Sequence, residues 1–183
     1  MLFVGTVNIP GEFHLKGGHI VLEAFTILNK KYNNLELVVR SDMPQAIKIK
    51  YAGIDNLRII DRIIPWELLE QEFKSADIFL FPAHHTPAGV FLDAMSYELP
   101  VITTDVHANP ELVEDGKTGL LIERSSKVPY YMENWIAPGV GDKSDFSKAI
   151  KVLDEAMVAD LVEKTSLLME DKELRRQMSK TGR

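Results

Sequence analysis

The chain has 183 residues, of which 45% are hydrophobic and 26% charged, a composition typical of one globular domain with a sizeable core. Its formal net charge of −6 argues against broad nucleic-acid binding, which needs a basic surface. The absence of cysteine excludes disulfides and thiolate chemistry. The chain contains no run of 18 apolar residues, so we expect no transmembrane segment. The first residues do not form a signal-peptide pattern, so we expect a cytoplasmic protein.

Short apolar runs alternate with helical patterns along the first two thirds of the chain. Strands are predicted at residues 2–7, 35–39, 57–60, 77–81, 100–104 and 119–122. Helices are predicted between them at residues 18–33, 44–51, 66–73, 90–97 and 110–114. This alternation is typical of βαβ units, so we predict an α/β fold with a Rossmann-like parallel sheet of about six strands flanked by helices.

The pattern changes after the sixth predicted strand. Residues 123–158 do not fit the repeating units and are interpreted as an insertion into a single domain that spans residues 1–183. Its aromatic residues, among them Tyr130 and Trp135, form either a surface for a partner or a loop packed on this domain. Helical patterns return at residues 146–153, 159–169 and 173–178.

Ligands of open parallel sheets bind at the carboxyl ends of the strands, and the first loop at that edge contains candidate phosphate-binding residues. Gly5 follows the first strand, and Lys16, Gly17 and Gly18 precede the first helix. Glycines let backbone amides approach a phosphate, and a lysine adds a cation. A plain turn with a solvated lysine is the alternative, because neither a P-loop nor a dinucleotide fingerprint is present.

The loop after the fourth predicted strand contains His84, His85 and Thr86, a polar cluster that is a good candidate for ligand binding. Thr86 alternatively caps the following helix, with Pro87 at its first position. Neighbouring histidines rarely share one metal ion, and no metal-binding spacing occurs elsewhere in the chain. We therefore predict no metal site.

Three further polar residues follow along the chain. Asp93 falls in an apolar stretch and is interpreted either as an acceptor for ligand hydroxyls or as a solvent-facing helix residue. Asn109 and Pro110 form the pattern of a helix N-cap and first position, with Glu111 in the first turn. That structural interpretation accounts for Asn109 and Glu111 without a ligand.

Three stretches resemble one enzyme family in their order and spacing: LFVGTV…KGGHIVLEAF, ADIFLFPAHHTPAGVFLDAMSYELPVITTDVHANPELVEDGKTGLLI and LLMEDKELRRQMSKTGR. They are similar to the C-terminal, donor-binding domain of family 4 (group 1) GT-B glycosyltransferases. The resemblance covers most of the chain outside residues 123–158.

The resemblance implies a domain that binds the nucleotide part of a sugar nucleotide. The enzyme would be a retaining glycosyltransferase that transfers a hexose from a UDP-, GDP- or ADP-sugar, its substrate, to an unknown acceptor without a cofactor. An N-terminal acceptor domain, absent from this chain, would complete the active-site cleft, so the isolated domain is expected to be inactive.

The resemblance assigns donor contacts residue by residue. The diphosphate is expected at Gly5, Thr6, Lys16 and Gly17, although Thr6 stands where the family usually has an arginine. The further donor contacts that it implies are Arg62 and Ile63 near the base, and His85, Thr86, Gly89 and Asp93 at the fourth predicted helix.

Two of these positions replace family glutamates. Asp93 would bind the ribose hydroxyls, and His85 stands where the family has a catalytic carboxylate near the transferred sugar. A histidine does not supply a fixed negative charge at neutral pH. The departures at Thr6, His85 and Asp93 therefore keep open a second hypothesis, a catalytically degenerate relative that acts as a scaffold or interaction module.

A phosphoacceptor receiver domain would share the alternating pattern of strands and helices. It requires an acidic cluster after the first strand, where this chain has Gly5, Thr6 and Val7 instead. We therefore set this third possibility aside.

Overall fold

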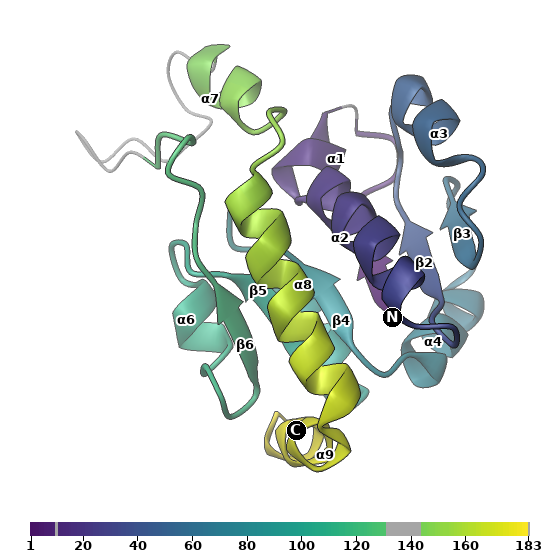
Figure 1. Ribbon diagram of the computed structural model, residues 1–183, viewed down its shortest axis with the longest axis vertical. Helices are drawn as coiled ribbons and strands as arrows, with labels where there is room; N and C mark the ends of the chain where they lie inside the picture. Colours follow the sequence, from purple (N-terminus) through teal and green to yellow (C-terminus); the bar gives the residue numbers. More distant parts are fainter. Residues whose placement is uncertain (10, 131–143, 183) are drawn as a thin grey trace.

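Six parallel strands form the centre of the protein. The computed structural model describes residues 1–9, 11–130 and 144–182. The sheet order is β3-β2-β1-β4-β5-β6 (Figure 1). Its strands are β1 (Leu2–Val4), β2 (Leu37–Arg40), β3 (Leu57–Ile60), β4 (Phe79–Phe81), β5 (Val101–Thr104) and β6 (Gly119–Ile122). The predicted α/β fold with a six-stranded parallel sheet is therefore confirmed.

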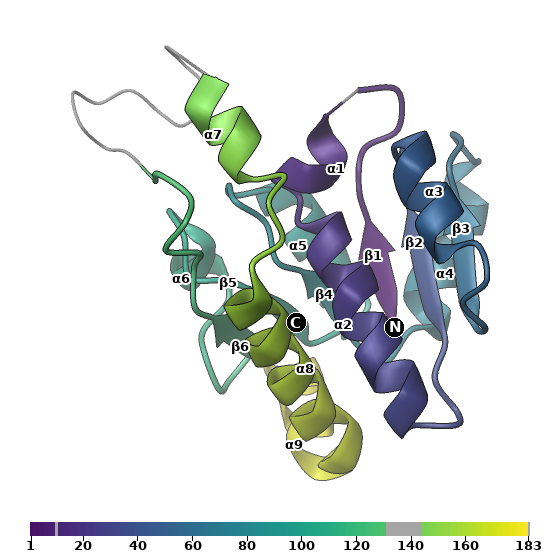
Figure 2. The ribbon, with the colours of Figure 1, turned by 45° about the horizontal axis from the view of Figure 1, so that its top comes forward.

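Helices cover both faces of the sheet. They are α1 (Glu12–Leu15), α2 (Gly18–Lys31), α3 (Gln45–Tyr51), α4 (Trp66–Ser75), α5 (Ala88–Ser96), α6 (Asn109–Leu112), α7 (Ser144–Ala149), α8 (Glu155–Glu170) and α9 (Lys172–Thr181). The two longest of these, α2 and α8, lie side by side across one face, while α4 and α5 lie behind the sheet (Figures 1 and 2). None of these helices is long and apolar enough to cross a bilayer.

Aromatic side chains fill the centre of the core, where the two middle strands are buried along their whole length. Phe3 of β1 stacks on Phe81 of β4, with ring centroids 5.1 Å apart, and Phe79 stacks on Phe81 in turn. Each fully buried ring contributes about 1.5–3 kcal/mol of transfer free energy. The junction between β1 and β4 is therefore a rigid part of the domain.

Element boundaries differ from the sequence prediction mainly beside the loops. The first strand ends at Val4 rather than residue 7, and residues 12–15 form the one-turn helix α1 instead of a loop. The helix predicted to begin at residue 159 begins at Glu155, because the Asp154 carboxylate accepts a hydrogen bond from the Ala156 amide and caps it.

The sheet has a topological switch point between β1 and β4. From β1 the chain proceeds to β2 and β3 on one side, whereas β4, β5 and β6 follow on the other. The loops after β1 and β4 therefore begin next to each other at this point, at the end of the molecule where α1 lies (Figure 2). Ligands of open α/β sheets bind in the crevice at such a point.

Candidate functional site

The loops after β1 and β4 pack closely against each other at the switch point. Gly17 has a left-handed backbone (φ 74), and a Cβ atom built there would lie 2.1 Å from the carbonyl oxygen of Pro82. The amide of His84 donates a hydrogen bond of 2.9 Å to the carbonyl of Leu15. Only glycine allows this close approach of two backbones, so residue 17 fixes the position of Lys16 relative to β4.

Lys16 lies inside this junction. Its side chain is 13% exposed and forms an ion pair with Glu12, with 2.8 Å between Nζ and Oε2. Its ammonium also donates a hydrogen bond to the Thr6 hydroxyl. The structure thus brings together Thr6 and Lys16, as the sequence predicts, and adds Glu12, whose only signal in the sequence is its i, i+4 spacing from Lys16.

A second cation lies on the other side of the turn at Gly5 and Thr6. Arg40, at the end of β2, donates a 2.9 Å hydrogen bond from Nη1 to the Gly5 carbonyl, and its own carbonyl accepts from the Gly5 amide. Its buried Nε has no hydrogen-bond partner among the described residues, and burial lowers the pKa of the guanidinium. The turn at Gly5 and Thr6 is therefore flanked by two cations, Lys16 and Arg40.

Gly5 allows β1 and β2 to meet closely below this turn. A Cβ atom at Gly5 would lie 2.3 Å from the hydroxyl of Ser41. Gly5 is consequently required for packing, which is a sufficient reason for a glycine here apart from any ligand.

His85 is half-buried beside Lys16 and Glu12. Burial, and then the charge of Lys16, lower its pKa to about 4, although Glu12 opposes the shift. The imidazole is therefore neutral at pH 7. The charged groups of the junction are Lys16, Arg40 and Glu12, and His85 contributes hydrogen-bonding capacity only.

His84 points into the protein, unlike its neighbour. It is 2% exposed, and its Nδ1 lies 2.6 Å from the Tyr130 hydroxyl, with the two rings stacked 6.0 Å apart. Tyr130 thus packs on this domain, which agrees with the second of the two interpretations of that segment. Trp135 lies outside the described residues.

Thr86 and Asn109 differ from their predicted roles as helix caps. The N-cap of α5 is Pro87, and the Thr86 hydroxyl instead accepts a hydrogen bond from the Ala108 amide at the start of α6. Asn109 is the first residue of α6 rather than its cap. Its buried amide donates to the carbonyl of Thr104 at 3.1 Å and approaches the carbonyl of His85 at 3.4 Å. Both residues join the loops after β4 and β5, which lie next to each other only in the folded sheet.

Replacing Asn109 by alanine is expected to destabilise the fold. The change removes a fully buried side chain and its hydrogen bonds to the Thr104 and His85 carbonyls and the Thr103 hydroxyl, which costs about 1–3 kcal/mol. Urea unfolding of Asn109→Ala beside the exposed-site control Asn33→Ala measures this difference. Equal stability of the two variants would contradict the linking role of Asn109.

The other predicted donor contacts lie on exposed surface. Gly89 and Asp93 are exposed on α5, and the Asp93 carboxylate forms no hydrogen bond with another described residue. Arg62 and Ile63 are exposed after β3, with 66% exposure for Ile63. None of these four residues contacts the Lys16 group through a hydrogen bond or ion pair within the described ranges, so a ligand would have to span the edge of the sheet to touch them all.

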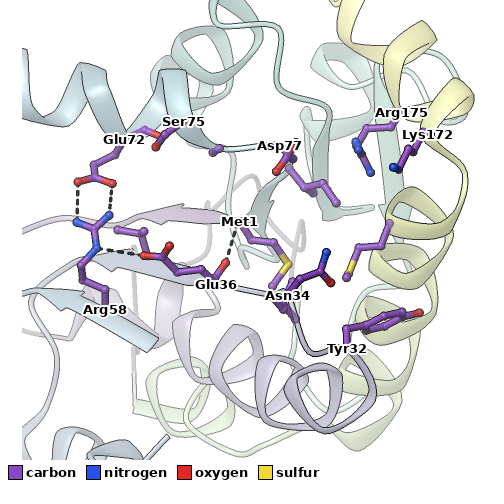
Figure 3. A pocket seen from close by; sticks show the side chains of 15 residues that line it. Met1, Tyr32, Asn34, Glu36, Arg58, Glu72, Ser75, Asp77, Lys172 and Arg175 are labelled. Atoms are coloured by element: carbon purple, nitrogen blue, oxygen red, sulfur yellow. Dashed lines mark hydrogen bonds and ion pairs between the residues drawn. The ribbon is translucent and has the colours of Figure 1, made fainter. Parts of the chain in front are cut away.

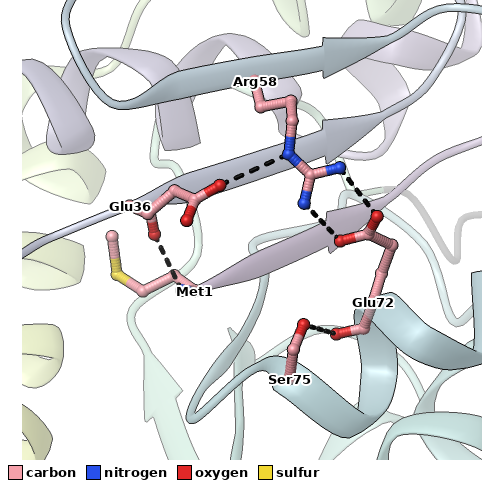
Figure 4. A network of polar contacts seen from close by, with 5 residues as sticks. All are labelled: Met1, Glu36, Arg58, Glu72 and Ser75. Carbon is pink, nitrogen blue, oxygen red and sulfur yellow. Dashed lines mark hydrogen bonds and ion pairs between the residues drawn. The ribbon is translucent and has the colours of Figure 1, made fainter.

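A cavity of about 510 Å³ opens at the opposite, amino edge of the sheet (Figure 3). Its charged residues largely neutralise one another: Arg58 forms a bidentate ion pair with Glu72 and also contacts Glu36 (Figure 4). Burial lowers the pKa of the Met1 ammonium, which donates to the Glu36 carbonyl. Its position at the amino ends of the strands argues against a ligand site of the usual α/β kind, whatever its volume.

A second cavity, of about 420 Å³, opens at the carboxyl edge beside α6. Its lining includes His107, Arg124 and Tyr130, and the Arg124 guanidinium lies 5.9 Å from the Tyr130 ring centre. Among the described residues, no group of three or more acidic, histidine or cysteine side chains is arranged to hold a metal ion. The carboxyl edge therefore offers cations, backbone amides and an aromatic ring as ligand contacts.

A family model described as "Glycosyl transferases group 1" matches residues 1–133. The chain belongs to this family. The similar curated proteins include the capsular polysaccharide biosynthesis glycosyltransferase CapM of Staphylococcus aureus, 26% identical over 113 residues, which are 60% of this chain and 30% of that protein. The chain spans about a third or less of the length of the curated relatives that it matches.

Solved structures show the fold of this glycosyl transferase chain. The C-terminal domain of the group 1 glycosyl transferase LpcC from Francisella tularensis superimposes with a TM-score of 0.69 at 21% identity, covering 99% of this chain and 80% of that one. The pneumococcal O-GlcNAc transferase GtfA, solved with UDP and GlcNAc, gives 0.65 at 16% identity, covering 99% and 31%. The chain therefore has the fold of a GT-B C-terminal domain, as its sequence predicts.

Proposed function

We propose that the chain is the donor-binding domain of a retaining glycosyltransferase and holds the diphosphate of a sugar nucleotide at the Lys16 junction. The observation that carries the proposal is the position of Lys16. It is held by the interlocked Gly17 and Pro82 at the switch point of a chain from the group 1 family. A fixed cation at such a point is suited to bind a phosphate.

The chemistry would follow from the charges around the turn at Gly5 and Thr6. When a glycosidic bond to the diphosphate breaks, negative charge accumulates on the departing phosphate, and fixed cations stabilise it. Lys16 supplies a point charge, and Arg40 lies on the other side of the turn. His85, neutral at pH 7, would act as a hydrogen-bonding group rather than as a carboxylate near the transferred sugar.

The remaining donor contacts extend the proposal along the sheet edge. Asp93 on α5 is open to bind ribose hydroxyls, with Thr86 and Gly89 preceding it, and Arg62 and Ile63 would lie beside the base. The structure of GtfA, solved with UDP and GlcNAc, supports a uridine nucleotide among the UDP-, GDP- and ADP-sugars. The acceptor would bind a second domain outside this chain, so the chain alone would not transfer sugar.

Thermal denaturation with nucleoside diphosphates tests donor binding. At about 100 times its dissociation constant, a bound ligand adds roughly 2.7 kcal/mol of stability, and the melting temperature rises accordingly. Lys16→Ala is expected to weaken this binding roughly tenfold to hundredfold, since it removes a charge-assisted contact. If UDP, GDP and ADP, bare or sugar-linked, all leave the melting temperature unchanged, the proposal is wrong.

A catalytically degenerate scaffold is the second candidate function. Two observations favour it: His85 is neutral at pH 7, and Lys16 is already paired with Glu12. A turnover assay on the complete enzyme decides between the two functions. Donor hydrolysis that disappears in Lys16→Ala would exclude the scaffold, whereas donor binding without turnover would support it.

A further inference from the structure

The Lys16 ammonium, the cation at the centre of the candidate site, already forms an ion pair with the carboxylate of Glu12. Glu12 Oε2 lies 2.8 Å from Lys16 Nζ, and both side chains are partly buried, with exposures of 27% and 13%. Glu12 is the first residue of α1, and Lys16 is the C-cap of that helix, one helical turn later. A phosphate approaching Lys16 would therefore meet a negative charge at contact distance from the same ammonium.

The Glu12 carboxylate is firmly ionised in this position. Burial opposes its charge, but contacts with Lys16 and Thr6 outweigh burial and lower the pKa of the carboxyl group. The other titratable group that faces it, His85, is neutral at pH 7. The cations that offset the repulsion between Glu12 and an incoming anion are Lys16, which both would bind, and Arg40, whose guanidinium is bonded to the Gly5 carbonyl.

Glu12 can leave Lys16 without unfolding its surroundings. The preceding Gly11 has a left-handed backbone (φ 91) with open space around the position of a Cβ atom. The next residue, Phe13, is 2% exposed and packs edge-on against Phe3, which anchors α1 in the core. Rotation of the Glu12 side chain toward solvent would thus free the cation while α1 stays in place.

We propose that Glu12 is an internal competitor for the donor diphosphate: its carboxylate holds the Lys16 ammonium in the empty site and must move away when a nucleoside diphosphate binds. This inference rests on the proposed donor binding. It makes Glu12 an affinity-determining residue, because every binding event includes the loss of the ion pair and the displacement of a like charge.

Calorimetric titration of the 183-residue chain with UDP, GDP and ADP tests the competition. Glu12→Gln keeps the size of the side chain and removes its charge, and it is expected to bind the preferred diphosphate at least about tenfold more tightly than the wild type. Glu12→Ala should bind more tightly as well, which separates charge from the particular contacts of glutamine. The affinity for the corresponding nucleoside, which has no phosphate, should stay unchanged.

The matched control is Glu23→Gln. Glu23 is exposed to a similar degree, 29%, and is also paired with a lysine, Lys50, but on α2. Its substitution should leave diphosphate affinity unchanged. If the wild type binds a diphosphate and Glu12→Gln binds it no better or more weakly, Glu12 does not compete and the donor-binding function stands. If neither protein binds any diphosphate, the donor-binding function itself is wrong.

Discussion

The free energy of unfolding is expected to fall by about 4 kcal/mol between pH 7 and pH 5 from the burial of neutral His19 and His84, and the half-buried His85 adds to this fall. Burial lowers the pKa of His19 to about 3 and that of His84 to about 4, and these side chains are only 5% and 2% exposed. In the unfolded chain both titrate near 6.5, so the unfolded state binds more protons as the pH falls. Each histidine then costs about 2 kcal/mol at pH 5.

The histidines and the carboxylates lose their contributions to stability over different pH ranges. The stability that neutral His19 and His84 allow is fully present above about pH 6.5 and is lost progressively as the pH falls toward their folded pKa values of about 3 and 4. Carboxylates with lowered pKa, such as Glu12 and Glu23, contribute stability that is lost only at lower pH, below the ordinary glutamate pKa of 4.5.

Urea unfolding at pH 7 and pH 5 measures the histidine effect. His19→Gln should remove about 2 kcal/mol of the pH dependence, since glutamine does not titrate. His107→Gln, at an exposed position, should change it little. Equal stability of the wild type at both pH values would contradict the burial of His19 and His84.

Gly17→Ala is expected to destabilise the fold by about 3 kcal/mol or more. The substitution forces a left-handed alanine and also places its Cβ atom against the Pro82 carbonyl, a backbone atom that cannot rotate away. For a domain of this length each kcal/mol lowers the melting temperature by roughly 2–4 °C, so calorimetry would detect the change easily.

Gly11→Ala is the control for that substitution. Gly11 is also left-handed, but a Cβ atom there would meet nothing within 4 Å. Gly11→Ala should therefore lower the free energy of unfolding only by the cost of a left-handed alanine, about 1 kcal/mol. If both variants lose the same stability, the loops after β1 and β4 do not interlock through Gly17.

The fold could be predicted from the sequence because its periodicities are strong. The run at residues 57–60 and the helical pattern that begins at Gly18 coincide with β3 and α2 almost residue for residue. Both are local signals, given by an apolar run in β3 and by apolar residues at helical spacing in α2. The helix α1 was missed because one turn between two glycines shows no periodicity.

The site was predictable only in part, since its contacts join residues distant in the chain. Lys16 was identifiable beside two glycines, but its partner Glu12 lay in a predicted loop. Arg40 reaches Gly5 across two neighbouring strands, and Asn109 reaches the His85 carbonyl from the next loop. A cap pattern at Asn109 and Thr86 was misleading because the tertiary contacts of these side chains outweigh their local preferences.

Backbone amide shifts during titration with UDP test the central claim most directly. Donor binding at the switch point predicts that the amides of Gly5, Thr6, Gly17 and His85 shift most, that uridine perturbs them far less, and that Lys16→Ala abolishes the difference. Shifts centred instead on the amino-edge cavity, around Tyr32, Glu36 and Lys172, would contradict the account.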